Sequence, residues 1–229
     1  MTSLQKWGKS VRTTIPVMAG YLVLGAGFGI LLRTRGYGLG WALAMSAFIY
    51  AGSMQYVAID LLTGGASLLT TAVTTLLVNA RHLFYGISML ERYRTAGKYA
   101  PYLIFSLTDE TYSLVAACEE LTGAECFRIS LLDQFYWVLG TALGSLAGAY
   151  LDFNTTGIDF SLTALFLTVF TEQWLETKDH APALIGLGVS ITCRLLFGAD
   201  NFLLPTMGGM LCCLLVLDAR RTRKGGESA

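Results

Sequence analysis

The residues best suited to chemistry include Asn79, Arg81 and His82, which end an apolar run long enough to span a membrane. An amide, a guanidinium and an imidazole are costly in lipid, so polar groups at such a place usually serve a function. On one continuous helix Asn79 and His82 share a face with Thr71 and Thr75, whereas Arg81 points elsewhere. Two interpretations stay open. This face lines a path through the bilayer, or Arg81 and His82 are anchors whose polar ends reach the cytoplasmic lipid interface.

Two adjacent carboxylates, Asp109 and Glu110, lie near the middle of another apolar segment. Intramembrane carboxylates commonly mark ion routes, substrate routes or proton relays. Neighbouring residues on a helix point about 100° apart, so the two carboxylates cannot both face one cavity. We expect one to face the path, while the other is protonated or pairs with an arginine. The structural alternative is a buried ion pair of Asp109 or Glu110 with Arg81.

A third polar group lies near the end of the apolar segment 39–59 and consists of Ser53, Met54, Gln55 and Tyr56. The Gln55 amide offers both a donor and an acceptor, and the small residues before it let a second backbone approach. A branched apolar side chain would find suitable neighbours in Met54 and Tyr56. A plain helix-packing interface has the same composition, so both interpretations stay open.

The composition indicates an integral membrane protein. Of 229 residues, 54% are hydrophobic and 14% are charged, with a mean hydropathy of +0.55; soluble domains carry about a quarter charged residues. The 16 basic and 16 acidic residues balance, which gives no indication of a nucleic-acid partner.

Motifs for catalysis or cofactor binding are missing from the sequence. It holds no Walker nucleotide loop, no Gly-x-Ser-x-Gly elbow and no zinc-protease signature. The two histidines are far apart, and the five cysteines lack the spacing of metal ligands. We therefore predict a protein that is not an enzyme and needs neither a metal nor another cofactor.

Apolar runs of about twenty residues predict an all-α integral membrane protein. The eight predicted segments are 14–32, 39–59, 66–88, 99–118, 130–150, 159–177, 181–198 and 202–218. Because the connections between them are short, we expect a single transmembrane transporter domain over residues 1–229.

Two of these segments, 14–32 and 130–150, are rich in glycine, and we predict them to be re-entrant hairpins. The glycines expected to break them include Gly25, Gly27 and Gly140. This topology places both termini in the cytoplasm. It also leaves Arg128 as the only basic residue of the predicted loops and termini outside, which fits the positive-inside rule better than eight crossings do.

A weak internal repeat supports the hairpins. Residues 23–29 resemble residues 138–144, and Gln55 has a counterpart in Gln173, which stands beside Glu172. The predicted order is repeat one (about 14–88), a linking span (99–118), repeat two (about 130–198) and a last span (202–218). Under the hairpin topology the repeats are inverted, as in many secondary transporters, whose substrate sites lie at the repeat interface near the midplane.

Several strings together resemble the AzlC/YgaZ family of branched-chain amino acid exporters. They are AGSMQ at 51–55, LLVNARH at 76–82, TDET at 108–111, WVLGT at 137–141 and DF at 159–160. The resemblance extends from about residue 14 to 216. It implies a bacterial inner-membrane permease for the export of valine, leucine and isoleucine, with methionine as a further candidate. It also implies a small second membrane subunit similar to AzlD. Met54 stands where relatives often carry a smaller residue, so the substrate preference stays open.

We therefore predict a subunit of a secondary transporter that exports an apolar amino acid and is driven by the proton gradient. The substrate-binding candidates are Ser53, Met54, Gln55, Tyr56, Asn79 and Arg81. Proton coupling is expected at Asp109 and Glu110, and the supporting residues are His82, Glu172, Gln173, Gly25, Gly27 and Gly140. The alternatives are a passive channel built from the two hairpins and a scaffold whose polar residues only join helices.

Overall fold

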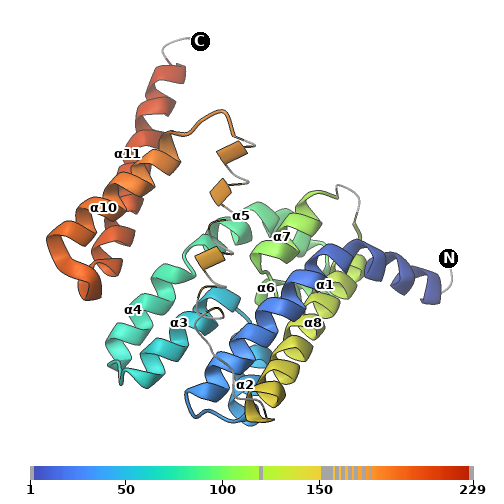
Figure 1. Cartoon of the computed structure of the whole chain (residues 1–229). Helices are drawn as coiled ribbons and strands as arrows, with labels where there is room; N and C mark the ends of the chain where they lie inside the picture. The colour runs from blue at the N-terminus through green and yellow to red at the C-terminus, as the bar shows by residue number, and fades with distance from the viewer. Residues whose placement is uncertain are drawn as a thin grey trace. The chain divides into compact units, whose positions relative to one another are not determined.

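The structure, a computed structural model, is helical throughout the part of the chain that it describes (Figure 1). The described residues are 3–118, 121–150, 157, 160, 163, 164, 167, 170, 171, 174, 175 and 177–226. The chain divides into two compact units, Met1–Ala164 and Leu165–Ala229, and each is described by itself. The single transporter domain stays a prediction.

A pair of long helices, α1 (Ser3–Thr34) and α8 (Gly123–Tyr150), lies side by side in the first unit (Figure 1). With 32 and 28 residues they are about 48 and 42 Å long, which exceeds the roughly 30 Å hydrocarbon core of a bilayer. Their contacts run in the same order along both helices, from Ser10 with Arg128 to Ile30 with Gly148. The two helices are therefore parallel.

Glycines bring the two helices into close contact. Gly25 and Gly29 on α1 are one turn apart, and they face Gly140 and Gly144 on α8. A Cβ atom built on Gly25 would lie 2.8 Å from the backbone oxygen of Trp137, so no larger residue fits there. Small residues four apart on both helices are the usual means of close helix packing in membranes.

The predicted re-entrant hairpins over 14–32 and 130–150 are wrong. Helices α1 and α8 continue through Gly25, Gly27 and Gly140 without interruption. A single glycine costs a helix only about 1 kcal/mol, and the close contact between the two helices offsets that cost. The glycines here serve packing and do not reverse the chain.

Polar contacts near the start of both helices also correct the predicted topology. The Nε atom of Arg128 donates to Ser10 Oγ at 3.4 Å, and Lys9 Nζ lies 3.9 Å from Glu125 Oε1. Arg128 and Lys9 are thus at one end of the helix pair, whereas the hairpin topology separates them across the membrane. The repeated strings 23–29 and 138–144 lie against each other in parallel, so their predicted inversion is not supported.

Three further predicted spans are interrupted helices. They form α2 (Leu39–Phe48) with α3 (Gly52–Thr63), α4 (Leu68–Val78) with α5 (Arg81–Arg94), and a 3-10 turn (Gly97–Tyr99) and α6 (Ala100–Phe105) with α7 (Asp109–Ala116). The residues between the halves are 49–51, 79–80 and 106–108, and none of them is glycine or proline.

Local backbone conformation ends the first half of each interrupted helix. Tyr50 has a left-handed φ of 44°, which costs a residue with a side chain about 1–2 kcal/mol. Thr108 is extended and caps α7, because its Oγ1 accepts from the Thr111 N–H at 3.3 Å. Between α4 and α5 the turn tightens, since the His82 N–H donates to the Asn79 oxygen only three residues back.

A capping box closes the first turn of α8. The Glu125 N–H donates to Thr122 Oγ1 at 3.3 Å, and the Thr122 N–H donates to Glu125 Oε2 at 3.0 Å. These bonds hold the pKa of the Glu125 carboxyl below its usual range. Their stabilisation is therefore present at neutral pH and is lost as the pH falls through the lowered pKa.

We expect Thr122→Ala to lower the free energy of unfolding by about 1 kcal/mol at pH 7, because the first N–H groups of α8 lose an acceptor. Denaturant titration in mixed micelles measures this loss. Thr95→Ala is the matched control, since the Thr95 hydroxyl donates only to an exposed carbonyl, that of Arg92. An equal loss for both variants would contradict the role of the capping box.

The second unit contains α10 (Ala181–Asn201) and α11 (Leu203–Gly226). They form an antiparallel hairpin in which a Cβ atom on Gly209 would lie 3.0 Å from Val189 Cγ1. Gly198 in α10 has a left-handed φ of 77° and marks a kink. Most of the predicted segment 159–177, including Glu172 and Gln173, lies outside the described residues.

Two helices of the described chain, Leu4–Thr34 and Ala181–Gly198, are long and apolar enough to cross a membrane, with mean hydropathies of 2.0 and 1.6. Shorter apolar helices are Leu39–Phe48, Leu68–Val78 and Gly208–Leu217. Two of these are half-helices of interrupted spans. Each of these two helices is short because the predicted span to which it belongs is divided into two halves.

Candidate functional site

Arg81 joins the three helix interruptions. It is the first residue of α5, and its Nη1 lies 2.9 Å from Oδ2 of Asp109, the first residue of α7. Its Nη2 donates to Ser53 Oγ at 2.5 Å, in the first turn of α3. The first turns of α3, α5 and α7 therefore meet at this guanidinium. Helix N-termini carry partial positive charge and leave N–H groups unpaired, so this junction suits an anionic group.

This contact decides between two of the earlier interpretations. Arg81 does not extend toward a lipid interface, because its guanidinium pairs with Asp109 and Ser53. The ion pair that the sequence left open is thus present. Both side chains are about one third exposed, at 32% for Arg81 and 35% for Asp109. The pair is therefore reachable and is not sealed in the core.

A second polar group runs from α7 to α1 and α8. The Tyr21 hydroxyl donates to Glu110 Oε2 at 2.7 Å and lies 2.7 Å from Thr108 Oγ1. Thr108 Oγ1 lies 3.1 Å from Thr111 Oγ1, which donates to Asp133 Oδ2 at 2.9 Å. Tyr21, Thr108, Thr111 and Asp133 are all buried. Glu110 and Asp133 are thus connected through hydroxyl groups alone.

Gln55 and Tyr56 pack α3 against α1 and α8. Gln55 is fully buried, its Nε2 donates to Ser46 Oγ at 3.1 Å, and its Oε1 accepts from Trp137 Nε1 at 2.8 Å. The Tyr56 hydroxyl donates to the Leu24 oxygen at 2.7 Å. Both polar groups therefore have partners within the protein.

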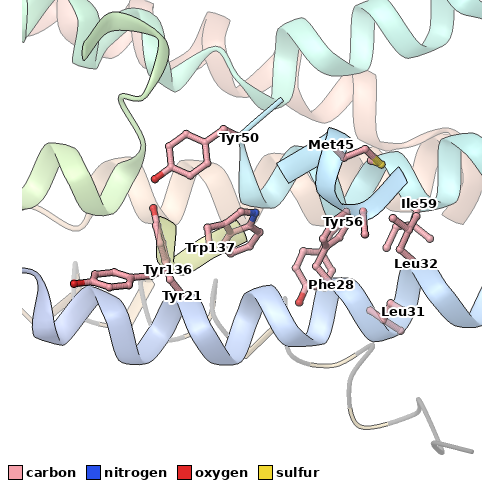
Figure 2. Packing of buried hydrophobic residues seen from close by; sticks show 11 residues of the cluster. Tyr21, Phe28, Leu31, Leu32, Met45, Tyr50, Tyr56, Ile59, Tyr136 and Trp137 are labelled. Carbon is pink, nitrogen blue, oxygen red and sulfur yellow. The ribbon is translucent and has the colours of Figure 1, made fainter. Parts of the chain in front are cut away.

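The aromatic residues of this core lie in two groups (Figure 2). Tyr21, Tyr136 and Trp137 lie near Tyr50, and Phe28 lies beside Tyr56. Tyr21 is also part of the polar chain. Tyr21 packs edge-on against Trp137 with a centroid distance of 5.3 Å. Tyr50, with its strained backbone, belongs to the same buried cluster as these rings.

A cavity of about 490 Å³ lies beside the interruptions. All three contribute to its wall, through Tyr50 and Ala51, through Asn79, and through Leu107. Its remaining lining comes from residues of α5 and α6 and from neighbouring positions: Ile49, His82, Gly86, Leu90, Tyr93, Arg94, Ala100, Ile104 and Phe105. The wall is mostly apolar with few polar groups, which is typical of small-molecule sites, and the volume lies within their usual range of about 300–1,000 Å³.

Asn79 provides a free acceptor at this cavity. Its Oδ1 is buried and has no hydrogen-bond partner among the described residues. The neighbouring His82 ring is already engaged, because its Nδ1 lies 3.1 Å from the Asn79 backbone oxygen, which can only accept. A buried acceptor without a partner is costly, so a ligand donor is a natural complement.

The structure separates the predicted site residues into groups. Ser53, Arg81 and Asp109 meet at the junction, and Glu110 lies on the hydroxyl-linked chain. Asn79 and His82 line the cavity. Met54, Gln55 and Tyr56 are buried in helix packing and do not line it. The predicted glycines Gly25 and Gly140 belong to the contact between α1 and α8, and Gly27 is buried in α1.

The residues that sequence reasoning missed include Tyr21, Tyr50 and Asp133, and the cavity residues Gly86, Ile104 and Leu107. Asp133 could have been found from the sequence, because it is a carboxylate inside the apolar segment 130–150. The same feature marked Asp109 in segment 99–118. Tyr50 could not, since no sequence pattern there predicts a left-handed backbone.

Apolar helices of spanning length, together with helices interrupted around a polar junction and a cavity, define a membrane transport protein as the class of protein. Non-helical backbone at membrane depth is tolerated where it lines a cavity inside the protein. The three interruptions here do so.

Comparison with known proteins agrees with this class. The AzlC protein family matches residues 16–151. The branched-chain amino acid transport protein AzlC of Bacillus subtilis (strain 168) is 44% identical over 208 residues, which cover 89% of this chain and 82% of the relative. The inner membrane protein YgaZ of Escherichia coli (strain K12) is 26% identical over 222 residues, or 90% and 87% of the two chains. An uncharacterised membrane protein of Helicobacter pylori (strain ATCC 700392 / 26695) is 42% identical over 207 residues, or 89% and 91%.

The chain belongs to the AzlC family, as the sequence strings predicted. No solved structure matches it. Relatives are named as membrane proteins, which agrees with the long apolar helices of this chain.

Proposed function

We propose that this chain is the large subunit of a secondary transporter that exports branched-chain or other apolar amino acids across the bacterial inner membrane. One observation carries the proposal: residues of all three helix interruptions line a single, mostly apolar cavity. The name of the Bacillus subtilis relative supports amino acids as the substrate class. Valine, leucine and isoleucine are the expected substrates, and methionine is a further candidate.

The cavity and the Arg81 junction, which is not part of the cavity lining, together offer complementary groups for each part of such a substrate. The carboxylate would bind near the first turns of α3 and α5, where N–H groups, helix dipoles and Arg81 favour negative charge. The ammonium group would donate to the free Oδ1 of Asn79. The branched side chain would pack on the apolar wall at Ile104 and Leu107, where each buried methylene contributes about 0.8 kcal/mol.

Proton coupling would use Asp109 and Glu110, which begin α7. Asp109 pairs with Arg81 at the junction, so its charge would respond to a bound carboxylate. Glu110 accepts from Tyr21 and leads away from the junction. Because both carboxylates lie in the first turn of α7, a shift of this helix would change the surroundings of both together.

Two further parts of the proposal rest on the family resemblance and on the distribution of basic residues. A small AzlD-like membrane subunit would complete the transporter. The N-terminus would face the cytoplasm, as Lys6, Lys9 and Arg12 before the first apolar segment predict.

Filling the cavity tests the proposal. A Cβ atom on Gly86 would meet nothing within 4 Å, so Gly86→Leu adds bulk to the cavity without a clash on its own helix. We expect valine counterflow in vesicles that also contain the small subunit to fall at least tenfold, because the side chain occupies the space of the substrate. Competition by unlabelled valine, methionine and alanine gives the specificity.

Gly20→Leu on α1 is the matched control, since a Cβ atom there also meets nothing within 4 Å and Gly20 is exposed. Full counterflow in Gly86→Leu would remove the cavity as the substrate site. No exchange of any amino acid by the unaltered pair of subunits would overturn the function itself. A channel would exchange valine but would never accumulate it against a gradient.

A further inference from the structure

We propose that Glu110 and Asp133 are the two ends of a buried hydroxyl relay that shares one proton and carries the coupling proton between them. The inference rests on the proposed proton-coupled transport and assigns it a path. The relay passes through the hydroxyls of Tyr21, Thr108 and Thr111. Asp133, which is fully buried on α8, becomes part of the transport machinery through it.

The geometry is continuous from end to end. Glu110 Oε2 and Thr108 Oγ1 each lie 2.7 Å from the Tyr21 hydroxyl. Thr108 and Thr111 are separated by 3.1 Å and Thr111 from Asp133 Oδ2 by 2.9 Å. Every contact is within hydrogen-bond distance. No water is needed to bridge a gap.

The number of protons shows why a carboxyl must be protonated. Tyr21, Thr108 and Thr111 carry one hydroxyl proton each, but the chain has four oxygen contacts. If both carboxylates were ionised, Tyr21 would donate to Glu110 and Thr111 to Asp133, and the single Thr108 proton could serve either Tyr21 or Thr111. One contact, Tyr21–Thr108 at 2.7 Å or Thr108–Thr111 at 3.1 Å, would then hold two oxygens without a proton between them. Two such oxygens repel, so a fourth proton from a carboxyl group completes the chain.

The fourth proton has two possible places, one at each end of the chain. On Glu110 it makes every hydroxyl donate toward Asp133, and on Asp133 it makes every hydroxyl donate toward Glu110. To pass between these states, each hydroxyl gives its proton to the next oxygen and receives one from behind. One proton leaves the Glu110 carboxyl, one arrives on the Asp133 carboxylate, and the three hydroxyls are restored.

The surroundings set which end is favoured. Glu110 is faced by the Arg81–Asp109 pair and by Tyr21. Asp133 is faced by Tyr50 and Tyr102, in addition to Thr111 and Glu110. The only full charges near the relay in the described chain are therefore those of the junction. A substrate carboxylate that draws Arg81 away from Asp109 would leave Asp109 as an unpaired anion beside Glu110, which favours the proton on Glu110.

The relay joins a closely packed helix pair to the start of a third helix. Tyr21 and Asp133 lie on α1 and α8, whose backbones are in close contact. Thr108, Glu110 and Thr111 lie at the start of α7, directly at the helix interruption. A shift of α7 by about 1 Å would break the Tyr21–Thr108 contact, because hydrogen bonds fail beyond about 3.5 Å. Movement of α7 with the substrate would thus connect and disconnect the proton path.

Thr111→Val tests the relay, because valine has the shape of threonine without the hydroxyl. We expect valine counterflow, which needs no net proton movement, to stay within about twofold of the unaltered protein. Uptake driven by a pH gradient, followed with a pH-sensitive dye inside the vesicles, should fall at least tenfold. Thr111→Ser restores a hydroxyl and should restore driven uptake. Retained driven uptake in Thr111→Val would overturn the relay.

Tyr21→Phe is a second variant, since it removes the hydroxyl next to Glu110 and keeps the ring that packs on Trp137. It should separate counterflow from driven uptake in the same way. Equal loss of counterflow and driven uptake in Thr111→Val and Tyr21→Phe would show a merely structural network and overturn the proposal.

Infrared difference spectroscopy of the purified protein gives a readout that does not depend on transport. A shared proton predicts one carboxylic-acid band that shifts in both Glu110→Gln and Asp133→Asn. Two independent bands, or a band that neither variant moves, would contradict the shared proton. If the band behaves as expected but no amino acid is exchanged, the proposed substrate is wrong and the relay stands.

Discussion

Arg81→Gln is expected to reduce valine counterflow by at least about thirtyfold. Truncating one member of a hydrogen-bonded charge pair in a binding site costs about 2–5 kcal/mol, and 2 kcal/mol corresponds to this factor. The guanidinium holds the first turns of α5, α7 and α3 together through Asp109 and Ser53. Its loss leaves Asp109 without an opposite charge at the place where the substrate carboxylate should bind.

The same substitution should destabilise the protein to a smaller degree. Removing one partner of a fully buried ion pair costs about 3–5 kcal/mol. Arg81 and Asp109 are each about one third exposed, so water compensates in part, and we expect about 1–2 kcal/mol. Denaturant titration in mixed micelles measures this loss next to the counterflow assay.

A neutral double variant separates a structural role from a functional one. In Arg81→Gln with Asp109→Asn, the two amides can hydrogen-bond and no charge is left unpaired. We expect stability to recover and transport to stay low, because no cation remains for the substrate carboxylate. If transport recovers together with stability, the pair only joins helices, and the substrate carboxylate must bind elsewhere.

Much of this junction could be predicted from the sequence, although its geometry could not. A polar group in an apolar run must find a partner, because leaving it unpaired in lipid costs several kcal/mol. This physical rule is local, and it singled out Arg81, Asp109 and Ser53, whose side chains the structure brings into contact. Which of them meet is a tertiary property, since they come from three different helices.

The interruptions were not predictable for a related reason. Glycine and proline are the residue types that mark a helix break in a sequence. Neither occurs at 49–51, 79–80 or 106–108. Tyr50 keeps a left-handed backbone in a buried setting. Such strain persists only where surrounding packing fixes it, and packing is invisible in a pattern of residue types.

At the glycines the sequence predicted chain reversals that the structure does not contain. A glycine-rich apolar string is compatible with a chain reversal and with close helix packing. The spacing of four between Gly25 and Gly29, and between Gly140 and Gly144, favours packing. The resemblance of residues 23–29 to residues 138–144 follows from the same cause, because the two strings form the two sides of one contact.

Gly29→Ala is expected to lower the free energy of unfolding by about 2 kcal/mol. The added methyl group would lie 2.6 Å from the Ser145 nitrogen and also against the Thr141 oxygen. Backbone atoms cannot turn away as a flexible side chain can, so the cost should be near the upper end of the usual overpacking range, about 3 kcal/mol. Alanine regains about 1 kcal/mol of helix propensity, which gives the net value. Denaturant titration in mixed micelles measures it.

Gly20→Ala on the same helix is the control, because the expected change in the free energy of unfolding has the opposite sign. A Cβ atom there meets nothing within 4 Å, so this variant keeps only the propensity gain and should be as stable as the unaltered protein or more stable by up to about 1 kcal/mol. Gly144→Ala places its methyl group against the backbone of Ala26 from the other helix and should match Gly29→Ala. If Gly29→Ala and Gly144→Ala behaved like Gly20→Ala, α1 and α8 would not be in direct backbone contact, and Tyr21 and Asp133 would lose the rigid frame that holds them in one hydrogen-bonded chain.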